Sequence, residues 1–191
     1  MHSIRTLIAS AVLAATGLAH ADSSTYALDP SHTFVTFEAK HFGTSTFRGR
    51  FDKKKGSVTL DKAAKTGSVK VTIDPASVST GVGALDNDLK SKDFFNAAEF
   101  PAVEFAASKF SFDGSKVKTV EGTLTLLGKT LPITLNATNF NCYESPLLKR
   151  EVCGGDFETT LQRSQWGMGY LAPTTVADNI RLLIQVEAIK Q

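Results

Sequence analysis

The amino-acid sequence predicts an all-β protein, an antiparallel up-and-down barrel of about eight to nine strands with a short helical cap after the fourth strand. Three observations lead to this fold class. Apolar and polar residues alternate with a period of two over most of the chain. Short polar turns separate the alternating stretches, and most stretches are apolar on one side only. Such a sheet must close on itself or form a sandwich; hairpin connections favour the barrel, and the sandwich is the alternative.

The first predicted strand lies within residues 32–43 and shows the alternation most clearly. Successive side chains of a strand point to opposite faces, so one face carries apolar residues and the other carries Thr36, Glu38 and Lys40. The apolar face consists of Val35, Phe37, Ala39 and, at its end, His41. We therefore expect this strand to form part of the wall of an apolar cavity with a polar group near one end.

Three more strands are expected before the cap, connected by short polar segments. Their inward-facing residues are Phe47, Gly49 and Phe51, then Val58 and Leu60, and then Val69, Val71 and Ile73. The run Lys53-Lys54-Lys55-Gly56 is interpreted as a solvated turn, with contact to anionic membrane lipid as its alternative.

The alternation stops after residue 74, where a cap is predicted. Residues 84–90 have aspartates early and a lysine late, as the dipole of a short helix favours. Residues 93–100 are expected to add a helical turn that Pro101 ends. The pair Phe94-Phe95 is too apolar for an exposed loop, so we expect this segment to cover one end of the sheet.

Strands resume after the cap. A change of parity near Ser108 predicts a β-bulge, Asp113-Gly114 predicts a hairpin turn, and Pro132 indicates an edge or an outward N–H position. In the strand expected over residues 157–163, Arg163 is the last residue of a face that is otherwise mostly apolar. The expected strands cover residues 102–112, 117–127, 131–137, 157–163 and 180–186.

The chain contains two cysteines, Cys142 and Cys153. If the protein is exported to an oxidising compartment, a structural disulfide between them is the default, and it would clip a loop over residues 139–155. The chain-entropy model gives such a bridge roughly 3 kcal/mol. A redox-active pair is the weaker alternative, because the spacing is unlike Cys-x-x-Cys.

Residues 1–21 have the features of a secretory signal peptide: a basic start, a short apolar run over residues 7–18, and the sequence Ala19-His20-Ala21 at the cleavage position. The remaining residues 22–191 form one predicted domain. Removing the signal leaves His32 and His41 as its histidines, which excludes a metal site built on several histidines. The low net charge, without a basic patch, does not indicate nucleic-acid binding.

A set of spaced motifs then resembles the YceI family of bacterial periplasmic proteins, in family order and over nearly all of residues 22–191. These motifs are Tyr26-x-Leu28-Asp29-x-x-His32-Thr33, Val35-x-Phe37-x-x-x-His41-x-Gly43, Gly49-x-Phe51, Val78-x-Thr80-Gly81, Leu89-Lys90-Ser91-x-Asp93-Phe94-Phe95, Phe100-Pro101-x-x-x-Phe105, Gly122-x-Leu124-x-Leu126-x-Gly128 and Arg163-Ser164-x-x-Gly167-Met168.

The resemblance implies a lipocalin-like barrel in the periplasm that carries or stores one long apolar lipid, without a cofactor and without enzymatic activity. The ligand would be a polyisoprenoid, a quinone-like molecule or a long acyl amide. Transient membrane contact and a homodimer are left open. Two features depart from the family: Thr33 replaces the usual serine and keeps the hydroxyl, and the cysteine-containing loop occurs in only part of the family.

The lipid-binding hypothesis assigns the inward-facing residues to a tunnel, and its alternative is that they fill a solid core. Thirteen phenylalanines and one tryptophan suit a smooth wall around an apolar chain. The proposed wall consists of Val35, Phe37, Phe47, Phe51, Val71, Phe94, Phe95, Phe105, Leu124, Leu126, Leu135, Phe157, Leu161, Trp166 and Met168.

His41 and Arg163 end apolar rows and are candidates for contact with a lipid head group. The alternative is that each satisfies backbone carbonyls or an acidic neighbour at the rim of the barrel. A second function hypothesis is an isomerase or hydrolase that acts on such a lipid through His41. Asp29 and His32 form either an acid–base pair or a turn cap, and turn caps are the commoner case.

Overall fold

Eleven β-strands form a single antiparallel sheet in the computed structural model, which describes residues 23–191. The predicted signal peptide, residues 1–21, lies outside the described residues. The strands are β1 (Ser24–Leu28), β2 (Phe34–His41), β3 (Ser45–Phe51), β4 (Lys54–Asp61), β5 (Thr66–Ile73), β6 (Val78–Ser79), β7 (Val103–Asp113), β8 (Lys116–Leu126), β9 (Lys129–Glu144), β10 (Glu151–Gln162) and β11 (Val176–Lys190).

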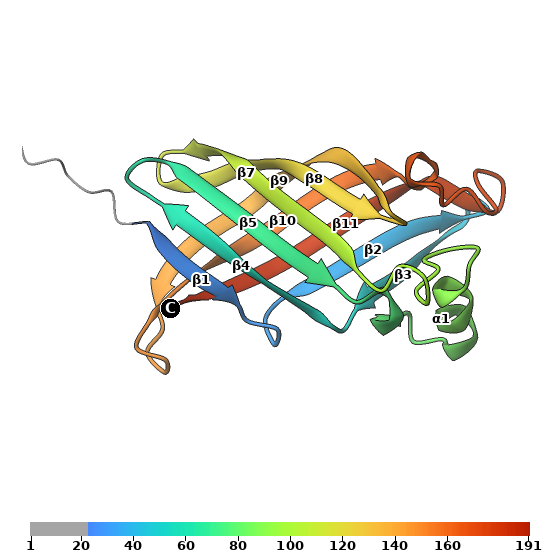
Figure 1. The fold of residues 1–191 in the computed structure, drawn as a ribbon, viewed down its shortest axis with the longest axis horizontal. Helices are drawn as coiled ribbons and strands as arrows, with labels where there is room; N and C mark the ends of the chain where they lie inside the picture. Colours follow the sequence, from blue (N-terminus) through green and yellow to red (C-terminus); the bar gives the residue numbers. More distant parts are fainter. Residues whose placement is uncertain (1–22) are drawn as a thin grey trace, which may run out of the picture.

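Eight of these strands form a closed ring (Figure 1). Their order is β1-β4-β5-β7-β8-β9-β10-β11, and β11 pairs back with β1. β2 also pairs with β11, β3 pairs with β2, and β6 pairs with β3. β1 and β2 thus act as two parts of one interrupted strand. The barrel is confirmed, and the sandwich alternative is excluded.

Thr33 lies at the interruption between β1 and β2. Its hydroxyl donates to the carbonyl of Glu187 at 3.2 Å and accepts from the N–H of Glu187 at 3.3 Å. One side chain thereby satisfies both backbone groups of a β11 residue where the strand ladder breaks. This contact explains why a threonine can replace a serine here, because both residues provide the hydroxyl.

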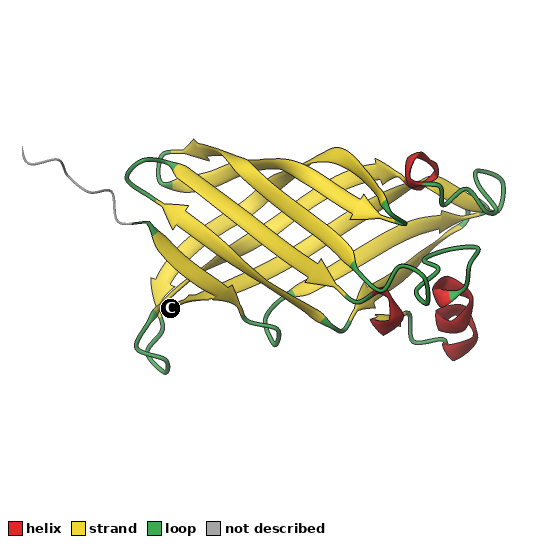
Figure 2. Ribbon diagram, viewed as in Figure 1, coloured by secondary structure: helices red, strands yellow, loops and turns green. Residues whose placement is uncertain are grey.

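The helical segments all lie at one end of the barrel (Figure 2), which we call the helix end. They are α1 (Gly83–Lys90) and the short 3-10 helices η1 (Pro75–Ser77) and η2 (Arg163–Trp166). The predicted cap helix after the fourth predicted strand, which is β5, is therefore confirmed. Residues 91–99 form turns and do not add a further helical turn.

The opposite end carries the β4–β5, β7–β8 and β9–β10 connections, and we call it the turn end. The first and last described strands also meet there, since Tyr26 of β1 is paired with Lys190 of β11. The bulge expected near Ser108 is confirmed by a register shift between Ala107 and Lys109. Pro132 lies in the part of β9 that pairs with β8 alone, which fits the predicted edge position.

Three predicted boundaries were wrong. No strand is predicted from the sequence before residue 32, but Ser24–Leu28 form β1. The turn predicted over residues 53–56 is mostly strand, because β4 begins at Lys54. The loop predicted over residues 139–155 is also mostly strand, and only residues 145–150 connect β9 with β10.

The glycines of β10 explain the error in that loop. A Cβ on Gly154 would come within 2.1 Å of the carbonyl oxygen of Val186, and one on Gly155 within 2.1 Å of that of Asn139. Both residues are paired with β9 and β11. Here glycine marks a close approach of three strands, although in the sequence it resembles a turn signal.

Candidate functional site

An apolar cavity of about 140 Å³ lies inside the barrel. A cavity needs roughly 10–15 Å³ to hold a single water, so this one is several times larger than that minimum. Its lining is almost entirely aliphatic and aromatic. Six predicted wall residues from six different strands line it: Val35, Val71, Phe105, Leu124, Leu135 and Phe157.

The cavity occupies the half of the barrel nearer the turn end. Leu60 is the penultimate residue of β4, Val117 is the second residue of β8, and both line the cavity. Tyr26, Phe140 and Ala188 complete the wall at this end, and all three are buried. The cavity therefore begins directly beneath the turn end and extends toward the middle of the barrel.

The remaining predicted wall residues do not line this cavity. Phe37, Phe51, Leu126, Trp166 and Met168 are buried in a second apolar cluster, against which Phe94, Phe95 and Leu161 pack from half-buried positions. The indole N–H of Trp166 donates to the carbonyl of Leu124 at 3.0 Å. This cluster packs the helix-end half of the interior and reaches the cavity through Val35 and Leu124, which belong to both; contact of its other side chains with a lipid stays a prediction.

Three phenylalanines form the centre of that closure. Phe95 comes from the turns after α1, and its ring lies 5.3 Å from the ring of Phe51 and 6.4 Å from that of Phe37, edge-on in both cases. Phe37 also covers Gly49 on the neighbouring strand, where an added Cβ would come within 2.3 Å of the ring. The predicted cap thus contributes a side chain that packs into the end of the barrel.

His41 and Phe47 lie next to each other on the strands at the helix end. The imidazole is 4.5 Å from the Phe47 ring and 4.7 Å from the Phe42 ring, measured between ring centroids. Neither residue lines the cavity. The contact of His41 with a lipid head group and the place of Phe47 in the tunnel wall both stay predictions, and a lipid confined to the described cavity would meet neither residue.

Arg163 is 2% exposed and uses its guanidinium within the protein. It donates to the carbonyls of Met168 at 2.8 Å, Tyr170 at 2.9 Å, and Ala177 and Val176 at 3.2 Å each. Burial lowers its pKa, and the nearby Asp178 opposes this effect. The arrangement matches the alternative in which Arg163 satisfies backbone carbonyls and fixes the chain after β10.

A polar group that the sequence analysis did not single out lies at the other end, on the cavity wall. The Tyr26 side chain lines the cavity, and its hydroxyl donates to Oε1 of Glu151 at 2.5 Å. Lys62 donates to the other oxygen of the same carboxylate. Burial, and then the contact with Glu151, raises the pKa of Tyr26 to about 12. Burial also acts on Glu151, but the hydrogen bonds from Lys62 and Tyr26 outweigh it and lower the pKa of that carboxyl.

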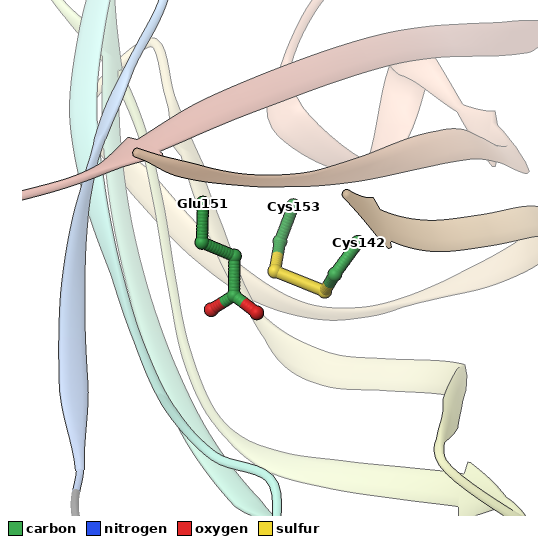
Figure 3. Close-up of side chains that lie close together, drawn as sticks. All are labelled: Cys142, Glu151 and Cys153. Carbon is green, nitrogen blue, oxygen red and sulfur yellow. A yellow bond between two sulfur atoms is a disulfide. The ribbon is translucent and has the colours of Figure 1, made fainter. Parts of the chain in front are cut away.

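The predicted disulfide is present next to Glu151 (Figure 3). Cys142 and Cys153 are direct cross-strand partners of β9 and β10, with Cα atoms 4.1 Å apart. The ligand atoms of these three residues lie within 4.8 Å of one another. Because both sulfurs are in the disulfide, only the carboxylate could act as a metal ligand, which is too few for a metal site.

Asp29 and His32 form a turn between β1 and β2. Hydrogen bonds from Ser31 and then from His32 lower the pKa of Asp29 to about 2. The same contact, Nδ1 of His32 to Oδ2 of Asp29 at 2.7 Å, raises the pKa of His32. The histidine is exposed and away from the cavity, which corresponds to the turn-cap interpretation of this pair.

Sequence reasoning missed several wall residues of the turn-end half. Val58, Leu60 and Val69 were identified as inward-facing but were not included in the proposed wall, although their parity would have placed them there. Tyr26 lacked a usable signal, because β1 is only five residues long. Within residues 23–191, the structure contains no helix long and apolar enough to span a bilayer.

Comparison with known proteins gives consistent results. The family described as YceI-like domain matches residues 26–188. A UPF0312 protein of Pseudomonas aeruginosa is 33% identical over 162 residues, which cover 84% of this chain and 83% of that protein. The crystal structure of a Campylobacter jejuni YceI protein is 29% identical with a TM-score of 0.71, over 80% of this chain and 90% of that one. A domain from Saccharophagus degradans, described as a polyisoprenoid binding domain, shares the fold at 15% identity with a TM-score of 0.61, over 87% of this chain and 98% of that one.

Proposed function

The chain belongs to the YceI-like family, and from that premise we propose that it binds one long apolar lipid chain in the barrel cavity and serves as a carrier or store. The observation that carries the proposal is the apolar cavity within a closed barrel. A space of this kind stays dry and takes apolar ligands.

The energy of binding would come from the length of the chain. At about 0.8 kcal/mol per buried CH₂, ten methylenes supply on the order of 8 kcal/mol before the cost of ordering. Chemical selectivity would be low, because the wall offers few polar contacts.

The ligand class that we favour is a polyisoprenoid, and quinone-like lipids and long acyl amides are further candidates. Support for the first comes from the Saccharophagus degradans domain of the same fold, to which the description as polyisoprenoid-binding belongs. We further propose that the protein acts in the periplasm, on the basis of the signal-peptide features of residues 1–21.

An enzyme that acts on the lipid through His41 is less well supported. That imidazole packs between two phenylalanine rings at the helix end, and it does not line the cavity. A general base must come within hydrogen-bond reach of the proton that it abstracts. A lipid held in the described cavity would leave His41 without such a contact.

Filling the cavity tests the carrier proposal. Leu135 is buried on the cavity wall, and its neighbour Thr134 is exposed on the outer face of β9. In delipidated protein, Leu135→Trp should lower the affinity for geranylgeraniol and for oleic acid at least about tenfold. The matched control, Thr134→Trp, should bind both ligands as the wild type does.

Circular dichroism and thermal unfolding verify that both variants fold. If Leu135→Trp does not fold, Val120→Phe fills the same cavity with a smaller increase in side-chain volume, because Val120 also lines it. Equal affinity of the wild type and a folded cavity-filled variant would show that the ligand binds elsewhere and would overturn the proposal.

A further inference from the structure

The connection between β9 and β10, residues 145–150, places two leucines in water at the turn end. We call this connection the hairpin tip. Leu147 is 88% exposed and Leu148 is 41% exposed. Figure 1 shows the hairpin tip projecting beyond the body of the barrel, next to the C-terminus. Single exposed apolar residues are common, so the exposure of these leucines does not by itself indicate a binding surface. The residues around them decide whether it does.

Exposed cations outnumber the exposed carboxylates, Asp113 and Glu144, at the turn end. Lys149 and Arg150 follow the leucines directly, and the neighbouring turns and strand ends carry further exposed lysines. Among the ion pairs of residues 23–191, none involves the cations of this group. The group consists of Lys65, Lys116, Lys118, Lys149, Arg150 and Lys190.

The hairpin tip has an ordered backbone. Ser145 is buried, its N–H donates to the carbonyl of Arg150 at 2.9 Å, and its own carbonyl accepts from the N–H of Lys149 at 2.9 Å. The Ser145 hydroxyl accepts from the N–H of Leu148 at 3.2 Å. The disulfide Cys142–Cys153 joins the two strands just below. The leucines are thus presented from a braced turn, which reduces the ordering cost of binding.

The opposite end has a different character. It also exposes apolar residues, Phe42 at 64% and Tyr170 at 51%. The exposed charges around them are mixed, however, and include carboxylates such as Asp93 and Glu99. The turn end therefore differs in presenting two adjacent exposed leucines that are followed directly by two cations, Lys149 and Arg150, and it is also the end beneath which the cavity begins.

We propose that the hairpin tip docks the turn end of the barrel on the surface of an anionic phospholipid bilayer. Leu147 and Leu148 enter the boundary between head groups and acyl chains, and the surrounding lysines and Arg150 contact the phosphates. The complementary charge of the cationic group selects an anionic bilayer over an uncharged one. This inference goes beyond lipid binding in the cavity and does not require it.

The docked orientation would hold the cavity-containing half of the barrel against the membrane. It also differs from the alternative considered for Lys53-Lys54-Lys55. In the structure Lys54 lies 4.9 Å over the Phe34 ring, and Lys53 approaches Asp74 at 3.9 Å, so two of its three lysines have partners within the protein.

Vesicle flotation tests the proposal with delipidated full-length mature protein. The probes are vesicles of phosphatidylcholine alone and vesicles of phosphatidylcholine and phosphatidylglycerol in equal parts. The wild type should float with the anionic vesicles, and less so at high salt. The double variant Leu147→Ser, Leu148→Ser and the double variant Lys149→Gln, Arg150→Gln should each bind at least about tenfold more weakly.

The matched control is Phe42→Ser with Tyr170→Ser, which removes two exposed apolar side chains at the helix end and should float as the wild type does. Geranylgeraniol binding should be unchanged in both tip variants, which separates docking from cavity binding. Failure of the wild type to float, or equal flotation of the tip variants, would overturn the proposal. A dimer that depends on the leucines, without vesicle binding, would assign the tip to a second copy of the chain instead.

Discussion

Tyr26 is the residue at which the apolar wall of the cavity meets a polar group. Its ring lines the cavity and is fully buried, while its hydroxyl reaches Glu151 at the turn end. The pair Asp29 and His32, by contrast, was noticed in the sequence and stabilises an exposed turn. The residue types alone thus did not distinguish the buried contact of Tyr26 with Glu151 from the exposed contact of Asp29 with His32. The position of the backbone decides which of the two contacts is buried.

The Tyr26 contact predicts a loss of stability at alkaline pH. The folded-state pKa of about 12 lies above the usual value of 10.0, so folding favours the neutral phenol. This contribution is complete below the unfolded-state pKa and is lost as the pH rises from about 10 toward about 12. Tyr26→Phe should remove this part of the pH dependence and cost about 1.5–3 kcal/mol at neutral pH.

Denaturant unfolding at pH about 9 and about 11 measures both effects. Tyr170→Phe is a suitable control, since that side chain is 51% exposed and its hydroxyl makes no hydrogen bond to another group of residues 23–191. An unchanged alkaline slope in Tyr26→Phe would contradict the assignment of the raised pKa to this residue.

Arg163 provides a second test at the residue scale. Because its guanidinium satisfies four backbone carbonyls, Arg163→Met should destabilise the protein by about 2 kcal/mol or more. Affinities for geranylgeraniol and for its phosphate should change by the same factor. Titration of both ligands into the variant measures the ratio, and a selective loss of the phosphorylated ligand would assign Arg163 to a head-group site.

At the scale of the elements, the sequence predicts strands well where one face is apolar and the other polar. Phe37 and Glu38 of β2 take opposite sides as the alternation requires, and the cap helix follows from its charge order. The pattern fails where a strand is short, as in β1, or where glycines permit three strands to approach closely, as in β10. In both cases the strand is determined by its partners, and partners are not visible in local sequence.

The cross-strand position of the disulfide leads to a prediction for the β9–β10 hairpin. Cys142→Ser with Cys153→Ser should lower the free energy of unfolding by about 2–3 kcal/mol, because the bridge restricts the unfolded chain. The barrel should still form, since the cysteines are paired along a ladder that reaches from Glu144 to Asn136 on β9. Urea unfolding of this variant, compared with wild type under oxidising and reducing conditions, measures the difference.

A variant that unfolds in the same urea concentration as the oxidised wild type would show that the bridge adds nothing to stability. Thr138→Ser on the same strand is a neutral control for handling and redox conditions, because it keeps the hydroxyl that bonds Asp156.

At the scale of the whole molecule, the interior is divided into a hollow half and a packed half. Strand parity predicts which side chains face inward, and six predicted wall residues do line the cavity. It does not predict that Phe95 from the turns after α1 and Trp166 from η2 pack in the helix end. That outcome depends on where turns and the cap lie in space, for which the sequence has no periodic signal.

The central claim is that the hollow half holds a long apolar lipid. Protein purified from its native host without detergent should carry one such lipid per molecule, which organic extraction followed by mass spectrometry would identify. Leu135→Trp prepared in parallel should carry none, and Thr134→Trp should carry the wild-type amount. A cavity that is empty in every wild-type preparation, or a lipid that is retained equally by Leu135→Trp, would contradict the account.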